Sequence, residues 1–200
     1  MPYRETARSR ARKEQMHSRI LREAVALFRE RGYEATGMRE IAAAAGTSVG
    51  NCYFYFADKE ALLLAAVDAV IADISTEADA AGRAEVDGGP KEQARALVTA
   101  GMQAALKRPV VTALMLSEAA RIPVRERIRT HFTARTVRFF AAHPELTGAA
   151  SPEVVAAAWQ GTILSVLERY LTGDLDYSSE GIAAFTAEWN LAALTSLSEE

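Results

Sequence analysis

Apolar side chains recur at spacings of three and four residues along most of the chain, which is the period of one face of an α-helix. Near the N-terminus this stripe runs through Ile20, Ala24, Leu27 and Phe28. Alanine, leucine, glutamate and arginine, which all favour helices, dominate, and no run of β-branched residues alternates with polar ones. The pattern predicts an all-α protein.

Small polar residues, glycine and proline indicate where the helices begin and end. Ser48 and Asp58 have side chains typical of N-caps, whereas Gly32 and Gly46 are expected to end helices. The segment 82–90, with three glycines and a proline, is expected to be a loop. The predicted helices cover residues 13–31, 38–45, 49–54, 58–80, 91–107, 110–120, 123–142, 152–172 and 179–197.

The two helices that flank Gly46 are too short to be stable alone, so they need the first helix to cover their apolar side. The residues expected to point inward are Ile41, Ala42, Ala45, Val49, Cys52 and Tyr53. This packing leaves short polar residues exposed at the start of the third helix, namely Thr47, Ser48, Gly50 and Asn51. Such residues fit a DNA major groove and bond to base edges or phosphates. We therefore predict a three-helix helix-turn-helix DNA-binding domain over residues 1–60.

Charge is divided unevenly along the chain, although the net charge is only −3. Residues 1–60 carry 11 Lys and Arg against 8 Asp and Glu, whereas residues 61–200 carry 12 against 18. A basic head on an acidic body favours a polyanionic partner for the head. Residues 1–13 contain one acid, Glu5, and five cations, which are Arg4, Arg8, Arg10, Arg12 and Lys13. This basic N-terminal segment cannot bury an apolar face, so we expect it to be disordered or frayed in isolation. It is either an arm that contacts DNA or a solvated tail.

About 45 consecutive residues carry a motif of fixed order and spacing. Its members are Ile20, Leu21, Ala24, Leu27, Phe28, Gly32, Tyr33, Thr36, Ile41, Ala42, Ala45, Gly46, Ser48, Gly50, Tyr53, Tyr55, Phe56, Lys59, Glu60 and Leu62. In this motif the sequence resembles the tetracycline-repressor (TetR) family of bacterial regulators. Gly37, Thr47 and Cys52 depart from the residues usual in that family. The rest of the chain is similar to the family only in its length and helical character.

The resemblance implies a recognition helix at residues 48–54, phosphate contacts from Tyr53 and Lys59, and a C-terminal domain that dimerises and binds a small molecule. A cation at the start of a helix opposes the helix dipole, and a phosphate arriving there would offset this cost. A solvated lysine beside Asp58 and Glu60 is the alternative for Lys59. The expected DNA-binding residues are Thr36, Thr47, Ser48, Gly50, Asn51, Tyr53, Tyr55 and Lys59.

Residues 61–200 are expected to form a helical ligand-binding and dimerisation domain. Its last two predicted helices are apolar over more than one face, so they need a second burial partner. The simplest partner is a second copy of the same helices in a four-helix bundle, and the alternative is that both apolar faces serve the monomer core. The expected interface residues are Ile163, Leu167, Phe185 and Trp189.

Methionine and phenylalanine residues between the DNA-binding domain and these helices either line an adaptable apolar cavity or simply fill a core. We place a small, largely apolar effector at Met102, Phe132 and Trp159. His131 and Arg135 are either polar groups at the mouth of that site or surface residues. The predicted function is a repressor that binds a palindromic operator as a homodimer and is released by the effector. An activator or a ligand-independent regulator of the same family is the alternative.

Other classes of protein are not favoured. The three histidines, His17, His131 and His143, lack metal-ligand spacing, and no nucleophile motif or glycine-rich phosphate loop occurs, so we expect no catalysis, metal or cofactor. Cys52 is the only cysteine, and its expected burial favours an inert thiol over a redox or electrophile sensor. No secretory signal or bilayer-spanning apolar run is evident, so we expect a cytoplasmic protein. The resemblance to the TetR family implies that it is bacterial and joins the nucleoid when bound to its operator.

Overall fold

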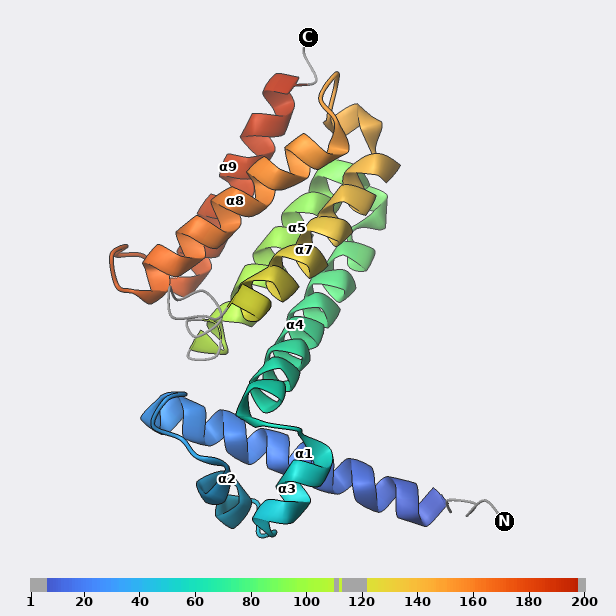
Figure 1. Ribbon diagram of the computed structural model, residues 1–200. Coiled ribbons are helices and arrows are strands. Elements are labelled where there is room, and N and C mark those ends of the chain that lie inside the picture. Colours follow the sequence, from blue (N-terminus) through green and yellow to red (C-terminus); the bar gives the residue numbers. More distant parts are fainter. Residues whose placement is uncertain (1–6, 110–111, 113–121, 198–200) are drawn as a thin grey trace. The chain divides into compact units, whose positions relative to one another are not determined.

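The computed structural model describes residues 7–109, 112 and 122–197, and over these residues it contains helices and no strand (Figure 1). The all-α prediction is confirmed. The helices are α1 (Ala7–Arg31), α2 (Met38–Ala44), α3 (Val49–Tyr55), α4 (Lys59–Ala84), α5 (Gly89–Leu106), α7 (Ile122–Ala142), α8 (Pro152–Leu171) and α9 (Ser179–Leu197), with short 3₁₀ helices η1 (Val86–Gly88) and η2 (Pro144–Leu146). The helix predicted over 110–120 lies, apart from Thr112, outside the described residues.

The chain forms two compact units, residues 1–69 and 70–200, and the boundary between them falls inside α4. In the first unit α2 lies against both α1 and α3 (Figure 1). The buried side chains come from all the helices of this unit and include Ile20, Ala24, Phe28, Ile41, Ala42, Cys52 and Leu62. The first helix thus covers the apolar side of the short helices, as the sequence pattern predicts.

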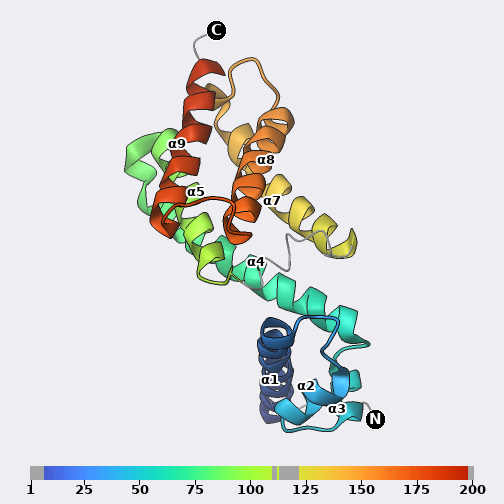
Figure 2. The ribbon, with the colours of Figure 1, turned by 90° about the vertical axis from the view of Figure 1, so that its left-hand side faces the viewer.

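The second unit packs α5 against α9, α7 against α8, and α8 against α9 (Figure 2). Its buried side chains include Val98, Met102, Phe140, Trp159, Ile182 and Leu194. The rings of Phe140 and Trp159 meet edge to face, with centroids 5.3 Å apart. Such an aromatic pair stabilises a fold by about 0.5–1.5 kcal/mol beyond the burial of its area.

The connection predicted over residues 82–90 is present but shorter, because α4 extends to Ala84, α5 begins at Gly89, and the 3₁₀ helix η1 lies between them. α4 continues through Gly82, and Pro90 lies in the first turn of α5, where its missing N–H costs no hydrogen bond. Gly82 serves helix packing, because a Cβ atom at this position would lie 2.9 Å from Cγ of Leu97 on α5. A glycine that looks like a helix breaker in the sequence therefore allows α4 and α5 to approach closely.

Gly82→Ala should lower the free energy of unfolding by about 1–3 kcal/mol, because overpacking against Leu97 outweighs the gain in helix propensity. Gly101→Ala is the matched control, since its Cβ would lie 3.6 Å from Cβ of Ala78, an ordinary contact. The control should gain about 0.5–1 kcal/mol from helix propensity. Urea unfolding followed by circular dichroism measures both values, and an equal gain in the two variants would contradict the close approach.

Candidate functional site

Local signals in the sequence set the ends of α2 and α3. The backbone N–H of Gly37 donates to Oε2 of Glu40 at 2.8 Å, and Gly46 adopts a left-handed φ of 61° just beyond the end of α2. At the start of α3, the N–H of Asn51 donates to Oγ of Ser48 at 3.1 Å. An N-cap of this kind stabilises a helix by about 1 kcal/mol. The predictions for Ser48 and Gly46 are confirmed, and they fix the turn between the two helices.

One side of α3 is open to solvent. Ser48, Gly50, Tyr53 and Phe54 are exposed, whereas Thr47, Asn51 and Tyr55 are half-buried. The side-chain amide of Asn51 donates to the hydroxyl oxygen of Thr47 at 2.8 Å, so these two polar residues hold each other in place. Tyr53, which we expected to point inward, is 51% exposed. The helix therefore presents an amide, hydroxyls and a phenol together on its exposed side.

Cys52 is fully buried on the opposite side of α3. Burial raises the pKa of its thiol, so the reactive thiolate is disfavoured at neutral pH. These two facts favour the inert thiol over the sensor.

Thr36 lies inside the first unit. Its side chain is 1% exposed, and its hydroxyl donates to the backbone oxygen of Gly32 at 2.8 Å. This hydrogen bond satisfies a carbonyl group at the end of α1, where the helix leaves carbonyls without partners. The hydroxyl of Thr36 is therefore not presented to DNA, contrary to our expectation from the motif.

Lys59 has a partner that the sequence did not suggest. Its ammonium group donates to the backbone oxygen of Tyr33 at 2.8 Å, and it lies 4.2 Å from the centroid of the Tyr33 ring. The hydrogen bond and the cation–π contact hold the first turn of α4 against the loop between α1 and α2. An ammonium group has three N–H donors, so this contact does not use up its capacity to bind a phosphate.

The basic N-terminal segment is helical from Ala7, and α1 therefore begins before the predicted residue 13. The disorder that we considered for this segment is wrong for residues 7–13, and residues 1–6 lie outside the described part of the chain. The ammonium group of Lys13 lies 6.0 Å from the ring centroid of the exposed Phe54. This contact brings the start of α1 next to the end of α3. The exposed cations on α1 include Arg8, Arg10, Arg12, Lys13, Arg19 and Arg22.

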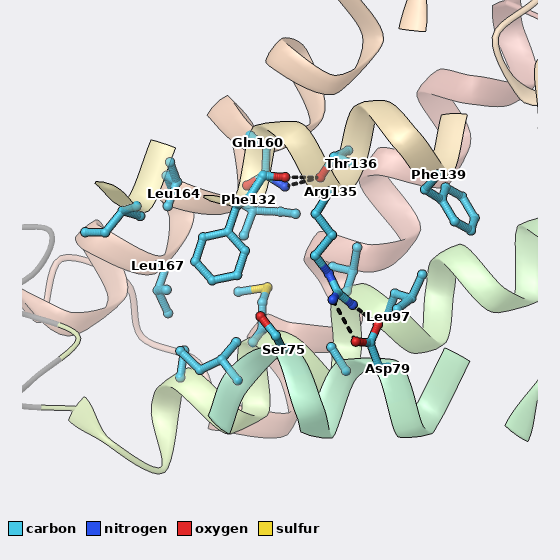
Figure 3. Close-up of a pocket in the computed structure, with 18 of the residues that line it drawn as sticks. Ser75, Asp79, Leu97, Phe132, Arg135, Thr136, Phe139, Gln160, Leu164 and Leu167 are labelled. Atoms are coloured by element: carbon cyan, nitrogen blue, oxygen red, sulfur yellow. Dashed lines mark hydrogen bonds and ion pairs between the residues drawn. The ribbon is translucent and has the colours of Figure 1, made fainter. Parts of the chain in front are cut away.

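The second unit contains a cavity of about 380 Å³ between α4, α5, α7 and α8 (Figure 3). Met102 and Phe132, two of the three predicted ligand residues, line it. Trp159 does not, because its ring is buried against Phe140 in the core. Periodicity placed Trp159 on the inner face of α8 correctly, but it does not distinguish the part of that face that fills the core from the part that lines a cavity.

Polar side chains in the cavity form pairs that link helices. Arg135 on α7 makes a two-pronged ion pair with Asp79 on α4 (Figure 3). The amide of Gln160 donates to the hydroxyl of Thr136 at 2.6 Å. Close by, Oγ of Ser75 and Nε2 of His131 are 2.9 Å apart. Of these residues, our sequence reasoning considered only His131 and Arg135.

The predicted dimer residues fall into two groups. Ile163 is half-buried, Leu167 is only 5% exposed, and both line the cavity, so they do not lie on the outer face of α8 as expected. By contrast, Phe185 and Trp189 on α9 are 47% and 60% exposed. Their rings stack at an interplanar angle of 27°, with centroids 6.1 Å apart.

A family model described as bacterial regulatory proteins of the tetR family matches residues 20–66. This range contains all of α2 and α3 together with parts of α1 and α4. Over residues 20–66 the chain is similar to the TetR family. The resemblance drawn from the sequence motif is confirmed.

Other proteins match different lengths of the chain. YerO, an uncharacterized HTH-type transcriptional regulator of Bacillus subtilis, is 44% identical over 50 residues, which are 25% of this chain and 17% of YerO. SmeT, the repressor of the Stenotrophomonas maltophilia efflux pump SmeDEF, has a TM-score of 0.72 and 22% identity, covering 88% of this chain and 89% of SmeT. FadR of Thermus thermophilus, a TetR-family repressor solved with lauroyl-CoA, has a TM-score of 0.64 and 25% identity, covering 90% and 94%.

The described part of the chain contains neither a candidate metal site nor a candidate membrane span. No group of three or more His, Cys, Asp or Glu side chains there is placed to hold a metal ion. None of the helices described has the length and apolar character needed to cross a membrane.

The ion pair in the cavity should make stability depend on pH. Hydrogen bonding to Arg135 lowers the pKa of Asp79 below its ordinary value. The pair therefore stabilises the fold above the unfolded-state pKa of about 3.9, and this stabilisation is lost as the pH falls through the folded-state pKa. Asp79→Asn should lower the free energy of unfolding at pH 7, with a difference that shrinks on acidification.

Urea unfolding at pH 7 and at successively lower pH values measures this difference between the wild type and Asp79→Asn. Asp176→Asn, at an exposed position, is the control for losing a carboxylate elsewhere. A deficit of Asp79→Asn that stays the same at every pH would contradict the assignment.

Proposed function

We propose that this chain is a TetR-family transcriptional repressor that binds a palindromic operator as a homodimer and is released by a small, largely apolar ligand. We assign DNA binding to residues 1–60, and ligand binding and dimerisation to residues 61–200. The observation that carries the proposal is the capped helix α3, with its polar residues on an exposed side.

The exposed side of α3 supports its role as a recognition helix in the major groove. Asn51 and Thr47 hold each other at the start of the helix, so an amide that can bond to a base edge is already oriented. Gly50 has no side chain and allows the backbone to approach DNA closely. Tyr53, and Lys59 at the start of α4, supply phosphate contacts, which position a protein without reading sequence. The proposed contacts are Thr47, Ser48, Gly50, Asn51, Tyr53, Tyr55 and Lys59.

The outer surface of α8 and α9 supports a two-fold interface. The stacked rings of Phe185 and Trp189 form an exposed apolar patch on α9, which a second chain would remove from water. Small exposed residues on α8 allow another helix to pack closely, and they are Ala157, Ala158, Gly161 and Ser165. A dimer also matches the symmetry of a palindromic operator.

The cavity supports control by a ligand. Its lining is mainly apolar and its volume of about 380 Å³ lies within the range of small-molecule sites. The FadR structure of the same fold was solved with lauroyl-CoA, and SmeT is named as a repressor. A ligand that binds the DNA-free state more tightly by about 1–3 kcal/mol would be enough to release the operator substantially.

Selection of bound duplexes from a random library tests the proposal directly. A TetR-type repressor should enrich a palindrome, and a reporter gene behind that palindrome should be expressed more strongly in a strain that lacks the protein. Enrichment of no sequence, or lower reporter expression in the deletion strain, would overturn the repressor assignment.

Asn51→Ala and Lys59→Ala should affect DNA binding differently. Asn51→Ala should lower affinity for the selected operator by about 1–3 kcal/mol and change the preferred base at one position in each half-site. Lys59→Ala should weaken all sequences alike and reduce the log–log salt slope by about 0.9 for each phosphate that the variant no longer neutralises.

Fluorescence anisotropy at several salt concentrations gives both quantities. Lys91→Ala, an exposed lysine of the acidic C-terminal domain, is the control and should leave binding unchanged. Because Lys59 also contacts Tyr33, the melting temperature of Lys59→Ala is measured in parallel. A variant that is as stable as the wild type and keeps its salt slope would refute the phosphate contact.

Trp189→Glu should shift the protein from dimer to monomer, because it places a charge in the proposed apolar interface. Sedimentation equilibrium measures the change, and operator affinity should fall with it. Val86→Glu also adds a charge at an exposed apolar residue but lies in η1, so it should leave the dimer intact. Persistence of a normal dimer in Trp189→Glu would place the interface elsewhere.

A further inference from the structure

The lining of the cavity carries more positive than negative charge. Arg135 and Arg138 both line it, and Asp79 is the only acidic residue among the lining residues that the structure describes. Arg83 and His131 lie close enough to Asp79 to favour its ionised form. The single carboxylate therefore already faces several basic groups, and the cavity retains a positive charge.

Arg138 supplies that uncompensated charge. It follows Arg135 by three residues on α7, which puts the two guanidinium groups on neighbouring positions of one helix face. Asp79 engages Arg135 through both of its carboxylate oxygens. In the described part of the chain, Arg138 makes neither a hydrogen bond nor an ion pair, and its side chain is exposed.

The ion pair and two leucines lie on opposite sides of the cavity. Figure 3 shows the pair of Asp79 and Arg135 at one end, and Leu164 and Leu167 toward the other. Phe132 and the buried Met102 add apolar surface to the lining. Such a division fits a ligand that has an anionic head and an apolar body.

We propose that the cavity binds a carboxylate carried on an apolar chain, with the carboxylate held by Arg138 and Arg135 and the chain lying along Phe132 and Leu167. This inference rests on the proposed ligand-binding function and names the chemical class of its ligand. A guanidinium group offers a planar fork of N–H donors that matches a carboxylate. A cationic head would meet repulsion from Arg138, and a neutral head would leave this donor fork without an anion.

Three ligands with the same ten-carbon chain test the head group: decanoate, 1-decanol and decylamine. Isothermal titration calorimetry on the full chain at pH 7.5, without DNA and below the micellar concentration, gives each affinity. Decanoate should bind at least about tenfold more tightly than decanol, and decylamine most weakly. The preference for decanoate should fall as salt is added, because Arg138 is exposed.

Arg138→Gln should reduce decanoate affinity toward that of decanol and leave decanol affinity unchanged. Arg129→Gln is the matched control, because Arg129 is an exposed arginine of α7 that pairs with Glu126 and does not line the cavity. Arg135→Gln should have the same effect as Arg138→Gln. If Arg135→Gln unfolds because it loses the pair with Asp79, Arg138→Gln still tests whether the cavity binds the carboxylate.

Equal affinity for decanoate and decanol would overturn the inference, as would a full preference for decanoate in Arg138→Gln, or no binding of any of the three ligands. The assay contains no DNA, so its outcome is separate from that of the operator selection. A chain that represses from a palindrome yet prefers decanol would keep the proposed function and lose only the anionic head group.

Discussion

A seven-residue helix is not stable by itself in water, and the proposed DNA-binding surface rests on two of them, α2 and α3. The stability of α2 and α3 depends on the burial of Ile41, Ala42 and Cys52 in the core of the first unit, together with residues of α1. This burial fixes the spacing between the two helices, and local caps fix their ends. The core does not use the polar residues on the exposed side of α3, so these residues are available for the proposed DNA contacts.

Sequence patterns predicted this unit well because its determinants are local. Caps at Ser48 and beside Gly46 involve residues within a few positions of each other, so their geometry follows from residue type. The contact between Lys59 and Tyr33 joins residues 26 positions apart, and no local rule indicates it. Thr36 has the residue type expected in the motif, yet its hydroxyl is turned toward the end of α1.

The roles of individual residues were predicted less well in the second unit. Helical periodicity indicates which face of a helix is buried, but it does not indicate whether that face packs in a core or lines a cavity. Trp159, Ile163 and Leu167 all lie on the inner side of α8, yet one packs in the core and two line a cavity. A clue was present in α4 and α7, where Asp79 and Arg135 interrupt apolar stripes. Burying a charge is costly unless a partner compensates it, so opposite charges on two apolar faces indicate a pair between those faces.

The ion pair also suggests how a ligand in the cavity could act on one helix selectively. α4 is joined to α7 by the pair of Asp79 with Arg135 and by Ser75 with His131, and three of these residues, Asp79, Arg135 and Ser75, line the cavity. On another side of α4, Glu77 bonds to Lys107 and Arg108, which do not line the cavity. A ligand carboxylate that competes for Arg135 would weaken the first link and spare the second. α4 runs without a break from Lys59 to Ala84. The helix whose link to α7 is weakened is therefore the helix that carries Lys59.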